Sequence, residues 1–373
     1  MKILLISSEY TGHGHKSICA ALTEQFSTYP NVETDIVDGF TWIGKMGLYM
    51  SKSYGPTTRY AKSLHRLTYE LGNRSAENVA ELIAALIRKK FTSYILDKRP
   101  DLIVTSHPLF NGSICILLKE MDLDIPVIAH QADLINIHTT WCDIRPYRTI
   151  CLTQEAEEVT MRQGLPREKV LLGGFPTRKA FCDAARSDHR EPYKGVGPFH
   201  CLIASGGEGS GSLRKYAKAL LRGFDCKVTV LCGRNARLKS LLEEDLSEYG
   251  GRLTVLGFVD NVQDYLMDSD LMISRASPNT IMEAVVCATP VILTGALPGQ
   301  EEENPAMIES HGLGVSCKSA KEMVQVVEGL MADGAAGLER IRQAQLRYRN
   351  LDNAKNNVDM IMKLYQQYKA GHN

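Results

Sequence analysis

Residues 273–308 read ISRASPNTIMEAVVCATPVILTGALPGQEEENPAMI, and this stretch decides the fold. It predicts an apolar strand, a turn at Pro278, a helix over about 280–287 and a second strand over 290–293. Ser277 or Asn279 is expected to cap the helix, because proline disfavours helical backbone at the residue before it. The stretch therefore predicts one βαβ unit of a parallel sheet.

The same stretch brings anion-binding and hydroxyl-binding groups together. The first turn of the helix presents unpaired N–H groups and the positive end of the helix dipole, which favour an anion. Glu283, one turn further on, is placed to accept hydrogen bonds from a ribose-like diol, and the loop 298–304 (PGQEEEN) is dense in groups that bond sugar hydroxyls. This order predicts a nucleotide-sugar site, and an ordinary βαβ unit with a charged surface loop is the alternative.

The composition is that of a globular protein with room for two domains. The chain has 373 residues, of which 44% are hydrophobic and 23% charged. Lys+Arg and Asp+Glu both total 43, so no net charge points to nucleic acid. The 10 cysteines include no CxxC pair, which argues against a zinc ribbon or a disulfide framework and for reduced thiols in a cytosol. Residues 2–6 are too short for a signal sequence, and no later stretch reaches membrane-spanning length.

The chain opens with a similar strand–turn–helix unit. Residues 2–8 (KILLISS) predict a buried parallel strand, which runs into the glycine-rich turn 11–17 (TGHGHKS) and a helix through Phe26. This geometry cradles a phosphate or a substrate, and two histidines in a loop at the end of a first strand indicate a catalytic base. A dinucleotide site is an alternative, although Ser17 stands where the third glycine of GxGxxG belongs.

Residues 42–69 combine cationic and aromatic side chains and contain no acidic residue. Cationic groups attract anionic lipid and aromatic rings suit the membrane interface, so the segment is predicted to face a membrane. A basic helical hairpin packed on its own domain is the alternative. Single-stranded nucleic acid would suit the same mixture, but no RNA- or DNA-binding motif accompanies it. The residues expected at the membrane are Trp42, Lys45, Lys52, Arg59, Lys62 and Arg66.

Two further buried strands end in polar groups. Residues 102–106 lead into His107, and residues 126–129 lead into His130 and, three positions later, Asp133. Because the carboxyl ends of parallel strands meet at one edge of a sheet, this edge is where a ligand is expected. His130, Asp133, His138 and Cys142 suggest a metal cluster as an alternative, but their spacing fits no standard site.

The polar stretch 187–198 predicts a linker, after which a second αβ half begins. It starts with a strand over 200–204 and a glycine loop over 205–211 (SGGEGSG), as the first half starts with a strand and a glycine-rich turn. The chain is therefore predicted to be α/β, with two facing Rossmann-like domains and a cleft between them. The expected parts are a first domain over 1–186, the linker over 187–198, a second domain over 199–350, and a C-terminal helix over 351–373 that packs back on the first domain.

Nine segments resemble one known family in their order along nearly the whole chain. They are TGHGHKS, TSHPL, ADLINIHTTW, GGFPTR, ASGGEGSG, CGRN, GFVDN, ASPNTIMEA and PGQEEEN. The chain resembles the monogalactosyldiacylglycerol synthases and processive diacylglycerol glucosyltransferases and is more distantly similar to the peptidoglycan UDP-N-acetylglucosamine transferase. This resemblance implies a two-domain GT-B fold, a UDP-sugar donor, a lipid acceptor, and inversion at the anomeric carbon without an essential metal.

The resemblance also assigns roles to single residues. The family's GGGH loop corresponds to residues 12–15, whose last histidine, His15, is the proposed base, and the family aspartate corresponds to Asp133, which orients His15 or is itself the base. The ribose-binding acid corresponds to Glu283, and the sugar-reading pair to Gln300 and Glu301. The acceptor loop is expected to contain Gly12, His13, Gly14 and His107. The donor site is expected to contain Gly206, Gly207, Glu208, Gly209, Arg234, Phe258, Ser277, Pro278, Asn279, Thr280, Glu283, Gln300 and Glu301.

Three positions depart from the family pattern. His13 replaces the middle glycine of GGGH and adds bulk where an acceptor headgroup approaches. Ser277 and Asn279 replace the two glycines of the family's A-G-P-G-T donor turn. These two side chains either donate hydrogen bonds to a phosphate or narrow the site, because glycine lets backbone approach a ligand closely.

The expected function is transfer of a hexose from a UDP-sugar to a lipid, for which diacylglycerol is the first candidate. The protein is expected to act as a peripheral protein on the inner face of the cell membrane. A UDP-sugar epimerase with the GT-B fold and a non-catalytic UDP-sugar sensor at the membrane are the alternatives. No cofactor beyond the donor, no metal and no nucleic-acid partner are expected. The sugar, the lipid, the number of sugars added and the oligomeric state stay open.

Overall fold

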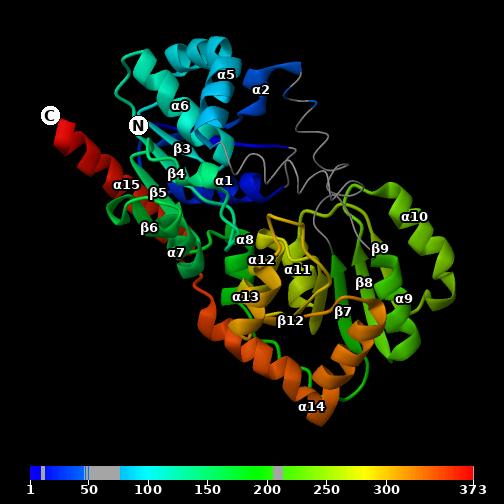
Figure 1. Cartoon of the computed structure of the whole chain (residues 1–373). Helices are drawn as coiled ribbons and strands as arrows, with labels where there is room; N and C mark the ends of the chain where they lie inside the picture. The colour runs from blue at the N-terminus through cyan, green and yellow to red at the C-terminus, as the bar shows by residue number, and fades with distance from the viewer. Residues whose placement is uncertain (10–12, 46, 48, 50–75, 205–212, 373) are drawn as a thin grey trace. The chain divides into compact units, whose positions relative to one another are not determined.

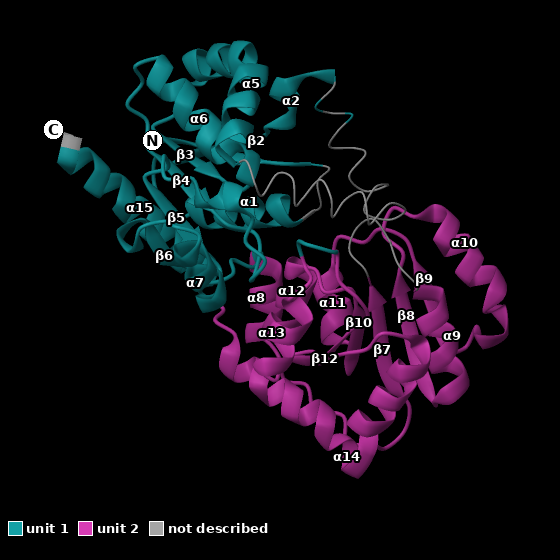
Figure 2. Cartoon of the chain, in the orientation of Figure 1, with its two compact units in different colours: residues 1–178, 298–300, 352–373 teal, residues 179–297, 301–351 magenta. Residues whose placement is uncertain are grey.

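The computed structural model describes residues 1–9, 13–45, 47, 49, 76–204 and 213–372. They form two compact units, coloured separately in Figure 2. The first unit comprises residues 1–178, 298–300 and 352–373, and the second comprises residues 179–297 and 301–351. Each unit holds one six-stranded parallel sheet, so the α/β prediction is confirmed.

The sheet of the first unit has the strand order β2-β1-β3-β4-β5-β6. Figure 1 labels its strands β3 to β6. The central strand β1 is apolar, and five of its six residues are buried, as expected for a strand covered on both faces. Leu5 of β1 lies opposite Ile36 of β2 and Val104 of β3, so the apolar runs are in register. The strands are β1 (Lys2–Ser7), β2 (Glu33–Asp38), β3 (Leu102–Thr105), β4 (Val127–His130), β5 (Arg148–Cys151) and β6 (Val170–Leu172).

The core on one side of this sheet contains the helices α2, α5 and α6. Trp42 packs edge-on against Phe91, with ring centroids 5.2 Å apart, and near Phe110 at 6.3 Å. Burying such large apolar side chains contributes roughly 1.5–3 kcal/mol each. The helical elements of the unit are α1 (His13–Phe26), α2 (Phe40–Ile43), α5 (Ala76–Lys98), α6 (Pro108–Glu120), η1 (Thr139–Cys142), α7 (Gln154–Arg162), η2 (Arg167–Lys169) and α15 (Asn353–His372).

The sheet of the second unit has the order β12-β11-β10-β7-β8-β9. Its chain crosses to the other side of the first strand after the third strand of the unit, β9, whereas in the first unit it does so after the second strand, β2. β10 pairs with β7 through Ile273 and Ile203, and both residues are fully buried. The strands are β7 (Phe199–Ala204), β8 (Cys226–Leu231), β9 (Leu253–Leu256), β10 (Leu271–Ser274), β11 (Val291–Leu293) and β12 (Gly314–Ser316). The helical elements are α8 (Lys179–Arg186), α9 (Leu213–Gly223), α10 (Ala236–Asp245), η3 (Ser247–Tyr249), α11 (Val262–Met267), α12 (Pro278–Val286), α13 (Asn304–Ser310) and α14 (Ala320–Tyr348).

The boundary between the units differs from the predicted one. The first unit ends at Arg178, whereas its predicted end was residue 186. The residues in between form α8, an amphipathic helix that packs its apolar face against α11 and α12 of the second unit. The polar composition of 187–198 therefore marks a surface segment within the second unit, and the chain crosses between units before α8.

The C-terminal helix α15 belongs to the first unit, where it contacts α1. Asn357 donates to the carbonyls of Gly173 and Gly174 at 2.8 and 3.2 Å and faces Nε2 of His130 through Oδ1 at 3.0 Å. A Cβ at Gly173 would lie 2.3 Å from Oδ1 of Asn357, so only glycine lets the helix approach this closely. The GGFPTR segment thus serves as the docking surface of α15.

No helix in the described part of the chain combines the length and the apolar character that crossing a bilayer requires.

Candidate active site

The carboxyl edge of the first sheet holds His15 in a buried position. α1 begins at His13, so His15 lies in the first turn of the helix, whereas the sequence placed it in the loop before the helix. Its side chain is 6% exposed, and Nδ1 hydrogen-bonds the carbonyl oxygen of Ser106, the residue after β3. Because a carbonyl only accepts, Nδ1 carries the proton and the lone pair lies on Nε2.

The electrostatics of the site keep this ring neutral. Burial lowers the pKa of His15 to about 4, although the hydrogen bond to Ser106 acts in the opposite direction. At neutral pH the imidazole is therefore uncharged and able to accept a proton at Nε2.

A second buried histidine packs against the first, with the two ring planes tilted by 49°. His107 lies 4.6 Å from His15 between ring centroids, and it caps α6 by accepting from the backbone N–H of Leu109 at 3.4 Å. Its Nδ1 is therefore an acceptor and its proton lies on Nε2. Burial, and then the proximity of His15, lower the pKa of His107 well below its usual value. Two neutral imidazoles thus lie in contact at this edge.

Asp133 lies at the same edge, in the loop after β4. It is 4% exposed, and Oδ2 accepts a hydrogen bond from the indole Nε1 of Trp141 at 2.8 Å. Gln300, which groups with the first unit, donates to Oδ1 at 3.2 Å. The Trp141 ring in turn lies 6.4 Å from the His15 ring between centroids. In the structure, Trp141 therefore lies against Asp133 and His15, and His107 packs against His15. Nδ1 of His15 is hydrogen-bonded to the carbonyl oxygen of Ser106 and not to Asp133.

The residues of the alternative metal-cluster hypothesis make hydrogen bonds within the protein. Nδ1 of His130 faces the Gln131 carbonyl at 3.0 Å while its Nε2 faces Asn357, and Cys142 donates to Gln163 at 3.0 Å. His138 caps η1 through a contact with the backbone N–H of Thr140. Across the described residues, no three His, Cys, Asp or Glu side chains are grouped as metal ligands would be.

The membrane prediction for Trp42 is wrong. Trp42 is 5% exposed and lies in the core described above, because its indole fills the space between α2 and α5. Lys45 is exposed. The remaining cations, Lys52, Arg59, Lys62 and Arg66, lie outside the described residues, as do Gly12 of the acceptor loop and Gly206, Gly207, Glu208 and Gly209 of the donor loop. Gly14 lies in the first turn of α1.

The carboxyl edge of the second sheet presents the helix that the sequence predicted. α12 begins at Pro278, two residues earlier than expected, because proline at the first helical position loses no hydrogen bond. Ser277 is the capping residue by backbone geometry, and its hydroxyl donates to Thr280 Oγ1 at 2.9 Å instead of capping the helix. Asn279 and Glu283 follow on the first two turns, both half-buried.

The role predicted for Glu301 as a sugar reader is not supported by its contacts. Its side chain is 6% exposed and pairs with Arg275, at 3.1 Å from Nε and 3.2 Å from Nη2. Oε2 also accepts from the backbone N–H of Leu297 at 2.9 Å. Glu301 thus holds the loop after β11 to the residue after β10, because a buried carboxylate needs a cation and an N–H donor.

Two more predicted donor residues meet at this edge. The Arg234 guanidinium lies 5.1 Å from the centre of the Phe258 ring, and this ring is 50% exposed. The two residues follow β8 and β9, so the neighbouring strands deliver them to the same edge. A flat, cation-backed aromatic ring suits stacking with a planar base.

The comparisons with known proteins bear on this arrangement. Residues 14–177 match the family described as monogalactosyldiacylglycerol (MGDG) synthase, and residues 206–356 match the glycosyltransferase family 28 C-terminal domain. The chain carries an MGDG synthase domain and is a glycosyltransferase.

Its relatives include plant and bacterial enzymes. Monogalactosyldiacylglycerol synthase 2 of Arabidopsis thaliana is 27% identical over 344 residues, which are 87% of this chain and 73% of the plant protein. The processive diacylglycerol beta-glucosyltransferase of Bacillus cereus AH187 is 27% identical over 372 residues, covering 97% of this chain and 93% of the other.

Solved structures share the fold. MurG of Acinetobacter baumannii matches with a TM-score of 0.65 at 14% identity, covering 97% of this chain and all of that one. UDP-GlcNAc 2-epimerase of Neisseria meningitidis matches with a TM-score of 0.63 at 10% identity and similar coverage. The GT-B prediction of two Rossmann-like domains is confirmed, while the cleft between them stays a prediction.

For this glycosyltransferase, sequence reasoning missed three residues of the two edges. Ser106 was passed over because its carbonyl, which sequence does not display, makes the contact to His15. Arg275 carries a usable signal, since a cation directly after a buried strand at the carboxyl edge needs an acidic partner. Trp141 appeared only as part of a family segment, although it is fully buried against Asp133.

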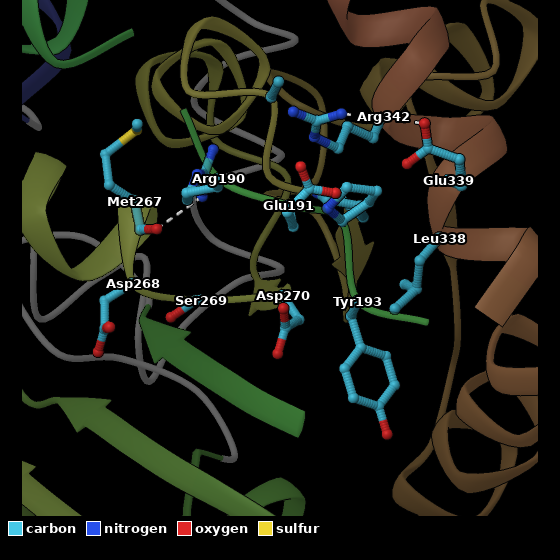
Figure 3. Close-up of a pocket in the computed structure, with 13 residues that line it drawn as sticks. Arg190, Glu191, Tyr193, Met267, Asp268, Ser269, Asp270, Leu338, Glu339 and Arg342 are labelled. Atoms are coloured by element: carbon cyan, nitrogen blue, oxygen red, sulfur yellow. Dashed lines mark hydrogen bonds and ion pairs between the residues drawn. The ribbon is translucent and has the colours of Figure 1, made fainter. Parts of the chain in front are cut away.

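A cavity of about 290 Å³ in the second unit does not belong to the donor site (Figure 3). Its lining includes Ser269 and Asp270, which precede β10, and Pro290, which precedes β11. It therefore lies at the amino edge of the sheet, on the opposite side from the N-terminal end of α12. The cationic side chains there are paired within the protein: Arg190 bonds Asp188 at 2.9 Å and the Met267 carbonyl at 2.8 Å.

Proposed function

We propose that this protein transfers a hexose from a UDP-sugar to diacylglycerol, with inversion at the anomeric carbon. The observation that carries the proposal is the neutral, buried His15, whose Nδ1–H is held by a backbone carbonyl so that Nε2 is left to take a proton. The relatives named for acting on diacylglycerol supply the acceptor class.

In this mechanism the acceptor hydroxyl attacks the anomeric carbon from the face opposite the diphosphate. The bond from that carbon to the phosphate oxygen breaks as the new C–O bond forms, and the electron pair leaves with UDP. The hydroxyl becomes strongly acidic as it bonds to carbon, so even an imidazole with a low pKa takes its proton at Nε2. Asp133 supports the charge that develops on this side.

The donor half of the proposal rests on the carboxyl edge of the second sheet. The first turn of α12 offers backbone N–H groups and a positive dipole end to the leaving diphosphate. Glu283 accepts from the ribose hydroxyls, and Phe258 with Arg234 stacks on the base. Asn279 donates to a phosphate in place of close backbone approach, and Ser277 does so once its hydroxyl turns away from Thr280. Gln300 hydrogen-bonds the hydroxyls of the transferred sugar.

The test is a donor panel. UDP-glucose, UDP-galactose and UDP-N-acetylglucosamine are each incubated with diacylglycerol vesicles and also without acceptor, and the products are read by mass spectrometry. The proposal predicts hexosyl-diacylglycerol with at least one donor. An epimerised UDP-sugar formed without acceptor supports the epimerase instead, and UDP binding without any transfer supports the non-catalytic sensor.

The reaction is proposed to need no metal ion, because helix N–H groups supply the stabilisation of the diphosphate. Transfer measured in excess EDTA is expected to match transfer in buffer. A loss that added magnesium or manganese restores would overturn this part.

The site of action is proposed to be the inner face of the cell membrane, reached through the cationic segment 42–69. Flotation with vesicles containing anionic lipid should retain the protein, and charge reversal at Lys45, Lys52 and Arg59 should release it. Reversal at Lys239, an exposed lysine of α10, is the matched control. Retention that survives the triple reversal would refute the electrostatic contribution.

A further inference from the structure

Trp141 makes a polar contact that packing alone does not require. Its indole Nε1 donates to Oδ2 of Asp133 at 2.8 Å, and the two side chains are 0% and 4% exposed. The indole N–H is a donor only. It bonds more strongly to an ionised carboxylate than to the carbonyl oxygen of a protonated carboxyl group. This bond therefore favours the ionised form of Asp133 and fixes the direction of its carboxylate.

The segment that carries Trp141 is held rigidly. η1 begins after His138, whose carbonyl accepts from the Trp141 backbone N–H at 2.9 Å. Asn111 of α6 donates to the carbonyl of Thr140 at 3.4 Å. The indole is therefore presented from a fixed backbone, which is the condition for orienting another side chain within a few tenths of an ångström.

The same ring also contacts the proposed base. The Trp141 and His15 rings are 6.4 Å apart between centroids and tilted by 34°. The other oxygen of Asp133 is held by Gln300 at 3.2 Å. One indole thus lies against both groups to which the proposed function assigns the proton transfer and its charge.

We infer that Trp141 is a positioning residue, which holds the Asp133 carboxylate ionised and aimed at the reacting centre. The inference rests on the proposed function, because it matters only if Asp133 takes part in transfer. The histidines on the surrounding elements are His15 on α1, His107 before α6, His130 on β4 and His138 before η1. Cys142 and Asp143 follow Trp141 directly, and Asp143 is paired with Arg145 at 2.6 Å. Burial lowers the pKa of His15, His107 and His130, so these rings are neutral at the pH of the assay.

The chain provides its own control. It contains 2 tryptophans, and the other, Trp42, is also buried but contacts the aromatic rings of Phe91, Tyr94 and Phe110. Trp42→Phe and Trp141→Phe therefore remove the same atoms from two buried sites, and only the second removes a donor to Asp133.

The experiment measures transfer by wild type, Trp141→Phe, Trp42→Phe, Asp133→Asn and the double variant Trp141→Phe/Asp133→Asn, with UDP-glucose or UDP-galactose and diacylglycerol vesicles. Trp141→Phe is expected to lower kcat about tenfold with little change in KM, since a hydrogen bond to a charged group is lost. The acid limb of its kcat/KM profile should move to higher pH, because the ionised carboxylate has lost a donor. In the Asp133→Asn background the same substitution should cost nothing further. Trp42→Phe should keep the wild-type kcat and profile.

An equal loss in both backgrounds, with an unmoved pH profile, would show that Trp141 only packs and would overturn the inference. Wild-type kcat for Trp141→Phe beside a slow Asp133→Asn would also overturn it and leave the proposed function standing. Wild-type kcat for Asp133→Asn would instead contradict the role of Asp133 in the proposed function. Should Trp141→Phe fold poorly, Trp42→Phe leaves Trp141 as the sole tryptophan, which can be excited selectively over the tyrosines. Its emission should then change with pH in the presence of Asp133 and lose that change in Asp133→Asn; a pH response equal in the two proteins contradicts the contact.

Discussion

The two units each hold a six-stranded parallel sheet, but the carboxyl edges of these sheets differ in how they treat charge. In the first unit, His15 and His107 are buried and neutral, and the contact that orients His15 comes from a backbone carbonyl. In the second unit, Arg275 and Glu301 form an ion pair, and Phe258 with Arg234 stays half open to solvent. Two parallel α/β sheets thus provide a dry edge suited to proton transfer and a charged edge suited to an anionic ligand.

This difference shows that the carboxyl edge of a parallel sheet locates the functional residues, while the burial of their side chains decides which chemistry they can perform. Water screens charges and competes for hydrogen bonds, so a general base gains from being dry. A nucleotide must enter and leave, so its site keeps partly exposed rings and half-buried polar groups.

The largest effect should come from the dry edge. His15→Ala is expected to lower kcat by about 10²–10⁴-fold, the usual contribution of a general base. The measurement is the rate of hexosyl-diacylglycerol formation. His189→Ala, which removes an exposed histidine of the second unit, is the matched control and should keep the wild-type rate. Equal rates for the two variants would remove His15 from the mechanism.

The same burial should make stability depend on pH. The pKa of His15 is about 4 in the folded protein and 6.5 for an unperturbed histidine, so protonation favours the unfolded chain. The stabilisation is fully present above pH 6.5 and is lost as pH falls toward 4, by about 3 kcal/mol from this group. Urea unfolding at pH 7 and pH 4.5 measures it.

A matched pair sharpens that measurement. His15→Gln should weaken the dependence of stability on pH in this range, leaving the part that the buried His107 and His130 contribute, and His189→Gln should leave it as in wild type. A wild-type slope in His15→Gln would mean that other groups cause the loss and that the first edge is less dry than its geometry indicates.

At the charged edge, Arg275→Ala should destabilise the second unit by about 1–3 kcal/mol, because it leaves the Glu301 carboxylate buried without its cation. Lys239→Ala breaks an exposed pair with Glu243 and should cost about 0.5 kcal/mol or less. Thermal or urea unfolding compares the two. Similar losses would show that water compensates Glu301, and its assignment as a loop-holding residue would fall.

The smallest effect should be on donor affinity. Glu283→Ala is expected to raise KM for the UDP-sugar about tenfold through loss of hydrogen bonds to the ribose, with kcat little changed. Glu244→Ala, an exposed acid on α10, should leave both constants unchanged. A fall in kcat with an unchanged KM would assign Glu283 to the chemistry and not to the donor.

The sequence predicted the features that depend on local pattern. Apolar runs such as residues 2–8 and 271–274 become the central strands, and Pro278 starts α12, because these signals lie in adjacent residues. His15, His107 and Asp133 were placed at one edge from the parallel topology alone, and the structure brings them together around Trp141.

The remaining features depend on partners distant in the chain. Trp42 was assigned to a membrane from its composition, but Phe91 and Phe110 cover it. Glu301 was assigned to a sugar, but Arg275 holds it. The domain boundary was drawn at polar residues, but α8 packs with the second unit. In each case a tertiary contact, which no single segment displays, decided the outcome.

The most direct test of this division between the two edges is calorimetry of UDP binding to wild type and His15→Ala, with transfer measured on the same samples. The account predicts that both proteins bind UDP with the same affinity, and that the variant transfers about 10²–10⁴-fold more slowly. No heat with wild type, or lost UDP affinity in His15→Ala, would contradict it.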